Sequence, residues 1–182
     1  MKYKQWNICT PRAGDCQAMT DAGIPPLPAV VLCARGLDTP EKARAFLDDR
    51  EELLHDPFLL KDMDRAVARI RRALEQHETI AVYGDYDVDG ITATCLLTDY
   101  LRRQGAQVIP YIPDRIGEGY GLSSHAVELL YKQGVTLIVT VDCGITAVLE
   151  TLRAAELGMD VVITDHHECK ETLPAAVAVV NP

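Results

Sequence analysis

The sequence lacks the features that mark membrane proteins, secreted disulfide-bonded proteins and thiolate zinc proteins. No hydrophobic run approaches the about 20 residues that a membrane-spanning helix needs. The first six residues hold no apolar stretch that could form a signal peptide. The six cysteines are scattered and form no C-x-x-C pair: Cys9, Cys16, Cys33, Cys95, Cys143 and Cys169. We therefore expect no zinc site and no disulfide framework, but reduced thiols in a cytoplasmic protein.

Large aromatic residues and basic side chains are also scarce. With 2 Phe and 1 Trp among 182 residues, Leu, Val, Ile and Ala must fill the core. Acidic side chains number 27 against 18 basic ones, which gives a formal net charge of −9. A nucleic-acid binder normally shows a basic surplus, so we expect no large phosphate-tracking surface in these residues. An acidic catalytic core remains compatible with this charge, because bound cations reverse the local field.

From residue 79 onward, strand and helix patterns alternate regularly. Val- and Ile-rich runs predict strands at 79–83, 107–112, 136–141, 160–164 and 177–180. Between them, helical patterns cover 90–104, 123–133 and 145–157. The strands show no polar alternation, as expected when both faces of a sheet are covered. The sequence thus predicts an α/β fold, a doubly wound, mainly parallel five-stranded sheet with helices on both faces.

Residues 1–78 predict a small, mostly helical region ahead of the domain at 79–182. One short helix is expected at 28–34, and another from Thr39 to about Leu47, with Thr39 as N-cap and proline at the first helical position. Residues 3–8 suggest a short strand.

A further helix is expected to begin near Asp62 or Asp64, because apolar residues recur there at helical spacing. Its basic side chains lie mainly off this stripe: Arg65, Arg69, Arg71 and Arg72. We interpret them as a solvated face rather than as a ridge that contacts phosphates.

The turn after the strand at 79–83 is rich in carboxylates. The stretch reads Tyr-Gly-Asp-Tyr-Asp-Val-Asp-Gly over residues 83–90, with Asp85, Asp87 and Asp89 at alternate positions. At least two of these side chains can converge on one point, where a divalent cation with oxygen ligands would neutralise them. The alternative is a turn that merely favours Asp and Gly and caps the next helix.

Two more strands end in possible metal ligands. The strand at 136–141 is followed by Asp142, and the strand at 160–164 by Asp165, His166 and His167. The carboxyl ends of parallel strands meet at one edge of a sheet, so these side chains become neighbours of Asp85. A mixture of carboxylate and imidazole suits Mn²⁺ or Mg²⁺. Two such ions would clamp a phosphoryl group and activate a water nucleophile.

Simpler roles are open for the same residues. Asp142 could be the N-cap of the helix at 145–157, and His166 and His167 could cap a helix or lie satisfied in the core. Cys143 has no identifiable base beside it, so we interpret it as a buried small side chain.

Several separated motifs resemble those of one family. Gly-Asp-Tyr-Asp-Val-Asp-Gly at 84–90, Val-Asp-Cys-Gly at 141–144 and Thr-Asp-His-His-Glu at 164–168 resemble the motifs of the DHH phosphoesterase family. The stretches that resemble its single-strand-specific exonucleases are Ile-Pro-Asp-Arg at 112–115, Glu-Gly-Tyr-Gly-Leu-Ser at 118–123, Ala-Arg-Gly-Leu-Asp-Thr-Pro-Glu at 34–41 and His-Asp-Pro-Phe at 55–58. The likeness covers most of the chain from about residue 28.

The resemblance implies a 5′→3′ exonuclease on single-stranded DNA that uses two Mn²⁺ or Mg²⁺ ions and acts in DNA repair and recombination. Its partners would be single-stranded DNA and other DNA-repair proteins, with no membrane involved. The implied metal ligands are Asp85, Asp87, Asp142 and His166, with Asp87 as the bridge between the ions. His167 would contact the scissile phosphate, and Asp165 would orient its neighbours.

The loop at 113–121 holds two candidate substrate contacts by the same resemblance. Arg115 would grip phosphate oxygens with its guanidinium group, although a surface salt bridge is an equal alternative. Tyr120 would stack on a base.

The chain departs from the family pattern at its end. The family places a further metal-ligand Asp well beyond its Asp-His-His motif and adds a second domain, whereas this sequence stops at Pro182. We therefore expect an incomplete DHH domain with weak metal binding and little nuclease activity alone. The alternatives are a DHH phosphodiesterase acting on small nucleotides or pyrophosphate, and a non-catalytic nucleic-acid-binding fragment.

Overall fold

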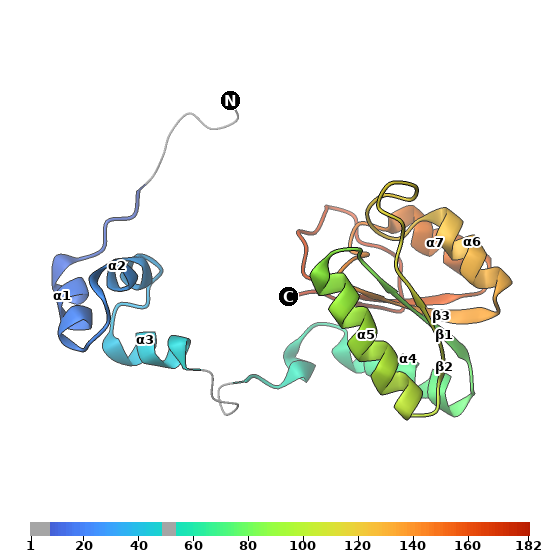
Figure 1. Cartoon of the computed structure of the whole chain (residues 1–182), viewed down its shortest axis with the longest axis horizontal. Coiled ribbons are helices and arrows are strands. Elements are labelled where there is room, and N and C mark those ends of the chain that lie inside the picture. Colours follow the sequence, from blue (N-terminus) through green and yellow to red (C-terminus); the bar gives the residue numbers. More distant parts are fainter. Residues whose placement is uncertain (1–7, 49–53) are drawn as a thin grey trace. The chain divides into compact units, whose positions relative to one another are not determined.

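The structure, a computed structural model, describes residues 8–48 and 54–182. The chain divides into two compact units, residues 1–55 and 56–182, whose helices and strands are labelled in Figure 1. The strand suggested at residues 3–8 lies outside the described residues except for Ile8.

The first unit is helical, as predicted. It consists of α1 (Ala13–Asp21), α2 (Pro26–Ala34) and α3 (Pro40–Leu47). The hydroxyl of Thr39 accepts a hydrogen bond from the Lys42 backbone N–H at 3.3 Å, so α3 begins where the N-cap signal placed it. Helix α1 was not foreseen, because its only buried residue is Met19 and it carries no clear apolar stripe.

The second unit contains the predicted sheet. Its five strands are all parallel and lie in the order β2-β1-β3-β4-β5. They are β1 (Thr79–Gly84), β2 (Gln107–Tyr111), β3 (Val135–Val141), β4 (Asp160–Thr164) and β5 (Ala178–Val180). The 3₁₀ helix η2 (Pro57–Leu59) and helix α4 (Met63–Glu75) precede the sheet in the chain.

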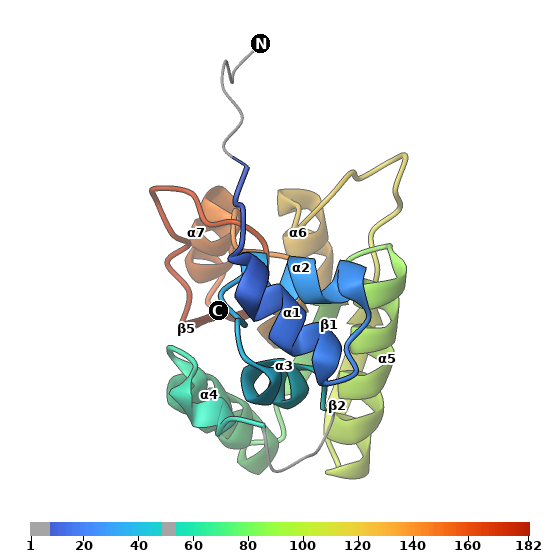
Figure 2. The ribbon, with the colours of Figure 1, turned by 90° about the vertical axis from the view of Figure 1, so that its left-hand side faces the viewer.

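Helices cover both faces of the sheet (Figure 1 and Figure 2). Helices α4 and α5 (Val88–Arg103) pack on one face, and α6 (Ser124–Lys132) and α7 (Val148–Glu156) on the other. In β1, Ile80 and Val82 lie in the hydrophobic core on the side of α4 and α5, while Ala81 and Tyr83 lie in the core on the side of α6 and α7. Both side-chain directions of a central strand are therefore buried, which explains why the strands read as unbroken apolar runs. The doubly wound α/β fold is confirmed.

Helix α4 packs with the sheet, so the compact unit begins at Asp56, ahead of the division that the sequence suggested between residues 78 and 79. Arg69 anchors this helix. Its side chain is only 8% exposed, and it pairs with Asp160 at 2.6 Å and with Glu78 at 2.7 Å. The interpretation of Arg69 as part of a solvated face is wrong, because these two carboxylates compensate its burial. The other three arginines of the cluster are not buried.

Among the residues that the structure describes, no helix combines the length and the apolar character needed to cross a membrane.

Candidate metal centre

The three central strands bring the predicted ligands to one edge of the sheet. Strand β3 lies between β1 and β4, with Gly84 opposite Val141 and Val141 opposite Thr164. The next residues in the chain, Asp85, Asp142 and Asp165, leave the sheet at this edge. Parallel strands thus place the three carboxylate-bearing loops side by side, as the sequence predicted.

Asp87 starts helix α5. Its Oδ1 accepts hydrogen bonds from the backbone N–H groups of Asp89 and Gly90, both at 3.0 Å. The bond from Gly90 lowers the pKa of the Asp87 carboxyl. Asp87 is therefore the N-cap, and the helix starts at Val88, two residues before the predicted start.

Gly90 lets this turn close on itself. A β-carbon at Gly90 would lie 2.7 Å from the carbonyl carbon of Asp85, closer than any real β-carbon approaches another atom. The backbone around Asp85 and the first turn of α5 are thus in direct contact, and this contact needs glycine.

Asp85 lies beneath the turn with an unsatisfied oxygen. The residue is 3% exposed, and its Oδ1 has no hydrogen-bond partner among residues 8–48 and 54–182. A buried carboxylate oxygen without a donor is unfavourable unless a cation compensates it. This atom is therefore direct support for a cation at this edge.

Asp142 lies in the left-handed region, with φ of 61°. Its Oδ1 lies 2.9 Å from Nε2 of His166, which donates a hydrogen bond to it. Burial raises the pKa of the Asp142 carboxyl, and the neighbouring charge of Asp87 adds to the rise. The alternative that Asp142 caps the following helix is wrong, because the N-cap of α7 is Ala147.

The possible ligand atoms form two overlapping groups. Oxygens of Asp85, Asp87 and Asp142 lie within 4.8 Å of one another, and so do ligand atoms of Asp142, His166 and His167. Asp142 belongs to both groups, whereas the resemblance led us to expect Asp87 as the bridge. All four predicted metal ligands thus converge, and His167 joins them.

Asp165 is fully hydrogen-bonded below the histidines. Its Oδ1 accepts hydrogen bonds from the backbone N–H of His166 at 2.7 Å and from Nδ1 of His167 at 2.7 Å, and its Oδ2 accepts one from the Ile145 N–H at 2.9 Å. Burial works to raise the pKa of Asp165, but these hydrogen bonds outweigh it and leave the pKa lowered. The bond to Asp165 in turn raises the pKa of His167. Asp165 thus holds the loop of both histidines in place.

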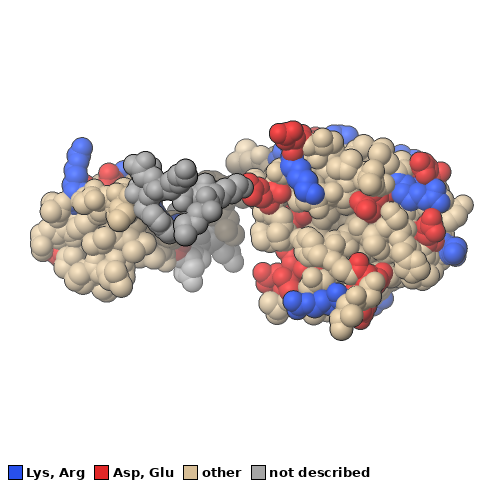
Figure 3. Space-filling view, turned by 90° about the horizontal axis from the view of Figure 1, so that it is seen from above, with Lys and Arg blue, Asp and Glu red and all other residues tan. Residues whose placement is uncertain are grey.

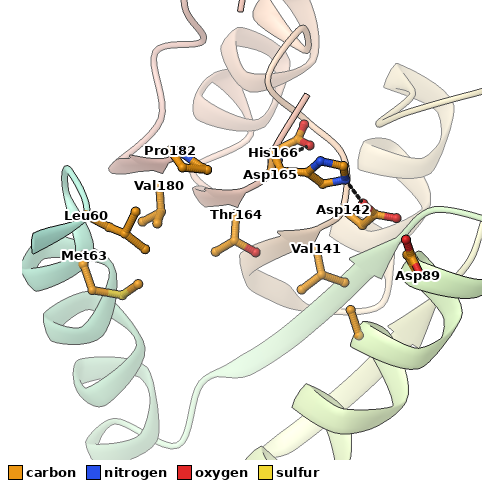
Figure 4. A pocket seen from close by; sticks show the side chains of 11 residues that line it. Leu60, Met63, Asp89, Val141, Asp142, Thr164, Asp165, His166, Val180 and Pro182 are labelled. Atoms are coloured by element: carbon orange, nitrogen blue, oxygen red, sulfur yellow. Dashed lines mark hydrogen bonds and ion pairs between the residues drawn. The ribbon is translucent and has the colours of Figure 1, made fainter. Parts of the chain in front are cut away.

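A cavity of about 490 Å³ opens beside these side chains (Figure 4). Asp142 and His166 face it from the ends of β3 and β4, and Asp89 borders it from α5. The rest of its lining is mainly apolar: Leu60, Met63, Ala93, Val141, Val180 and Pro182. Of the candidate metal ligands, Asp142 and His166 are therefore accessible from a concave surface, as ligand sites usually are.

The loop at 113–121 reaches the same edge. The hydroxyl of Tyr120 lies 3.1 Å from Nδ1 and 3.2 Å from Nε2 of His167, and the rings of Tyr120 and Tyr86 are nearly perpendicular with their centres 6.4 Å apart. The guanidinium carbon of Arg115 lies 5.1 Å from the centre of the Tyr86 ring. Within the described part of the chain Arg115 makes no ion pair, so the salt-bridge alternative is not what the structure has.

Two neighbours of the site were missed from the sequence. The side-chain amide of Asn181 donates a hydrogen bond to the carbonyl oxygen of His167 at 3.1 Å, which ties the end of β5 to the histidine loop. No local signal marks Asn181. Tyr86 could have been found, since it stands between two candidate ligands in the motif.

The described surface carries no broad basic area on the face that Figure 3 presents. Over residues 56–182, Lys and Arg side chains are interspersed there with Asp and Glu. This arrangement agrees with the acidic balance of the sequence.

The residues present fit a divalent metal centre. An unpartnered buried carboxylate oxygen, a second carboxylate shared between two groups and two adjacent imidazoles form an oxygen-rich donor set. Mn²⁺ and Mg²⁺ accept such ligands, whereas the thiol of Cys143 is buried and points to the Tyr83 carbonyl.

Comparisons with known proteins agree with this geometry. The model of the DHH family, N-terminal domain, matches residues 79–182. The chain is 45% identical over 179 residues to the single-stranded-DNA-specific exonuclease RecJ of Bacillus subtilis, with 98% of this chain but 23% of that protein covered.

Two solved structures are similar as well. RecJ of Thermus thermophilus in complex with Mn²⁺ matches with a TM-score of 0.69 and 32% identity, over 96% of this chain and 24% of that one. The same protein in complex with Mg²⁺ matches with a TM-score of 0.52 and 29% identity, over 88% and 19%. The chain thus spans about a quarter of the length of its relatives.

Proposed function

The chain belongs to the DHH family, and on that premise we propose that it forms the N-terminal part of the catalytic core of a single-stranded-DNA-specific 5′→3′ exonuclease. Its role would be in DNA repair and recombination. The observation that carries the proposal is the convergence of Asp85, Asp87, Asp142 and the two histidines at one sheet edge. The name of the similar protein of Bacillus subtilis supports single-stranded DNA as the substrate.

The proposed metal ligands are Asp85, Asp87, Asp142 and His166, holding two Mn²⁺ or Mg²⁺ ions. Asp142 would be shared by the ions, because it alone belongs to both groups of ligand atoms. When bound, such ions activate a water molecule and neutralise charge on the phosphoryl oxygens. The hydrogen bond that His166 donates to Asp142 would be exchanged for metal coordination.

His167 and Asp165 would act together on the substrate phosphate. Asp165 fixes the ring of His167 through the bond to Nδ1, and Nε2 lies 3.2 Å from the Tyr120 hydroxyl, whose place a phosphate oxygen would take. A protonated His167 at this position would donate to a phosphate oxygen and offset its developing charge. Arg115 would grip a phosphate from the loop at 113–121, and Tyr120 would stack on a base.

The chain covers only part of the length of its relatives, and this affects the activity that we expect from residues 1–182 by themselves. Because the chain spans about a quarter of its relatives, we propose that residues 1–182 bind metal weakly and hydrolyse DNA slowly. The partners would be single-stranded DNA and other DNA-repair proteins. We also propose a cytoplasmic setting, which the six free cysteines support.

A labelled-substrate assay tests the function. Single-stranded DNA labelled at the 5′ or the 3′ end is incubated with the purified chain, with Mn²⁺ or with a chelator. We expect slow, Mn²⁺-dependent release of nucleotides from the 5′ end. Release from the 3′ end, or faster hydrolysis of dinucleotides or pyrophosphate in the same panel, would refute the assignment. Rapid exonuclease activity would refute only the proposal of weak activity.

A further inference from the structure

We propose that Tyr86 is a positioning residue, which holds the guanidinium group of Arg115 ready for a substrate phosphate. This inference rests on the function proposed above and assigns a role to a side chain between two candidate metal ligands. The central observation is the contact of Arg115 with the face of the Tyr86 ring, at 5.1 Å from its centre. This distance lies within the range of cation–π attraction.

Among the residues that the structure describes, none accepts a hydrogen bond from the guanidinium group of Arg115, so this contact leaves its donors free. The nearby carboxylates are engaged elsewhere: Asp114 accepts from the backbone N–H groups of Ile116 and Gly117, and Glu118 accepts from the Tyr111 hydroxyl and the Asp114 N–H. A carboxylate partner would occupy the N–H groups of the guanidinium. An aromatic face attracts the cation and leaves those N–H groups available for phosphate oxygens.

The ring of Tyr86 is itself held at the metal edge. Its backbone lies between Asp85 and Asp87, in the turn that supplies two candidate ligands. Its ring meets Tyr120 edge to face at 6.4 Å and 79°, and Tyr120 contacts His167. The orientation of the Tyr86 ring is thus set by the same turn and loops that carry the candidate ligands. The guanidinium group of Arg115, on the face of this ring, is therefore held beside them.

Loss of the Tyr86 ring should affect the binding of DNA but not the binding of metal. The metal groups consist of carboxylate and imidazole side chains, and Tyr86 is neither, so its removal should leave the affinity for Mn²⁺ unchanged. Its removal should free Arg115 to move in an exposed loop, and binding of a phosphate chain should then weaken.

Fluorescence anisotropy with a labelled oligothymidylate tests this, using phosphorothioate linkages that resist hydrolysis and buffer that contains Mn²⁺. Tyr86→Leu should weaken binding about threefold to fivefold, the loss that an exposed cation–π contact represents. Tyr86→Phe keeps the aromatic face and should bind like the wild type. Tyr131→Leu changes an exposed tyrosine on α6 and is the matched control.

A double-mutant cycle completes the test. Once Arg115→Ala has been made, adding Tyr86→Leu should cause no further loss, because the two residues act through one contact. Binding of Mn²⁺, followed by electron paramagnetic resonance, should be equal in wild type and Tyr86→Leu, which also shows that the variant is folded.

Three results would overturn the inference: unchanged oligonucleotide affinity in Tyr86→Leu, losses that add in the double variant, or reduced Mn²⁺ affinity in Tyr86→Leu. In each of these cases the exonuclease assignment stands if the wild type binds the oligonucleotide in Mn²⁺. Failure of the wild type to bind it overturns both proposals.

Discussion

The guanidinium group of Arg69 and the carboxylate of Asp160 lie 2.6 Å apart, although 91 residues separate them in the chain. Arg69 also binds Glu78, which accepts a further hydrogen bond from the hydroxyl of Thr136 at 2.7 Å. These groups join α4 to the starts of three central strands. They lie at the end of the sheet opposite to the candidate metal centre, so the stability of the fold can be altered there without changing a ligand.

Arg69→Met should destabilise the second unit by about 3 kcal/mol at pH 7, because the side chain of Glu78 is only 14% exposed and would lose its cation. Urea denaturation followed by circular dichroism measures this. Arg103→Met is the control: its ion pair with Asp99 is exposed, and its loss should change stability by less than about 0.5 kcal/mol.

The same pair should make stability depend on pH. Burial alone would raise the pKa of Glu78, but the bonds from Arg69 and Thr136 lower it below its ordinary value of 4.5. A lowered pKa in the folded state stabilises the protein above that value, and the contribution disappears as the pH falls through the folded-state pKa. The difference between wild type and Arg69→Met should therefore stay nearly constant from pH 7 to about pH 5 and shrink as the pH falls below 4.5. A constant difference would contradict this origin.

Asp142→Asn tests the shared ligand without straining the backbone. Asparagine tolerates the left-handed conformation that this position has, at φ of 61°, so the fold should persist. Loss of a carboxylate common to both ligand groups should weaken Mn²⁺ binding by about a hundredfold or more, beyond the effect of losing an outer partner. Electron paramagnetic resonance measures the free Mn²⁺.

The same variant separates an enzyme from a binding module. A non-catalytic module would keep its affinity for single-stranded DNA in Asp142→Asn, with or without Mn²⁺. For the exonuclease core we expect the residual hydrolysis to vanish and the Mn²⁺-dependent part of DNA binding to fall.

Asp85→Asn should be more stable than the wild type without metal and less stable than the wild type with Mn²⁺. In the wild type without metal, the charged carboxylate of Asp85 has a buried oxygen without a partner and lies close to two other carboxylates. A neutral amide removes this charge, so the variant should be more stable by about 1 kcal/mol. With Mn²⁺ at about a hundred times its Kd, the wild type should gain about 2.7 kcal/mol and the variant much less. Thermal unfolding in chelator and in Mn²⁺ measures both. A wild type that Mn²⁺ does not stabilise would argue against a metal at Asp85.

Gly90→Ala should disrupt the turn that carries Asp85 and Asp87. The added methyl group would overlap the Asp85 backbone, so we expect a loss of at least about 2 kcal/mol together with weaker Mn²⁺ binding. Gly14→Ala is the matched control, because nothing lies within 4 Å of a β-carbon there and its effect should stay below about 1 kcal/mol. Equal stability of Gly90→Ala and wild type would contradict the close approach.

The fold and the meeting of the candidate ligands at one sheet edge were predictable because local patterns determine them. Apolar runs without alternation identify buried parallel strands, and the topology of such sheets brings the residues after β1, β3 and β4 together. The capping signal at Thr39 likewise depends on neighbouring residues only.

The errors came from contacts that are distant in the sequence. Arg69 reads as a surface residue until Asp160 is placed beside it. Helix α7 starts at Val148 instead of residue 145, and the Ile145 N–H binds the side chain of Asp165, 20 residues later in the chain. Sharing of Asp142 between two ligand groups depends on how three loops meet, which no single motif reports.

The strand order also has a kinetic consequence. Because β3 is inserted between β1 and β4, and the ligands follow these three strands, no two of the ligand-bearing loops are neighbours until non-local strand pairing has occurred. Such pairing is slow, since the entropy of closing long loops must be lost first. A cation that needs Asp142 together with Asp85, or together with His166, can bind only late on the folding route. The bound cation would therefore lower the rate of unfolding and leave the rate of folding almost unchanged.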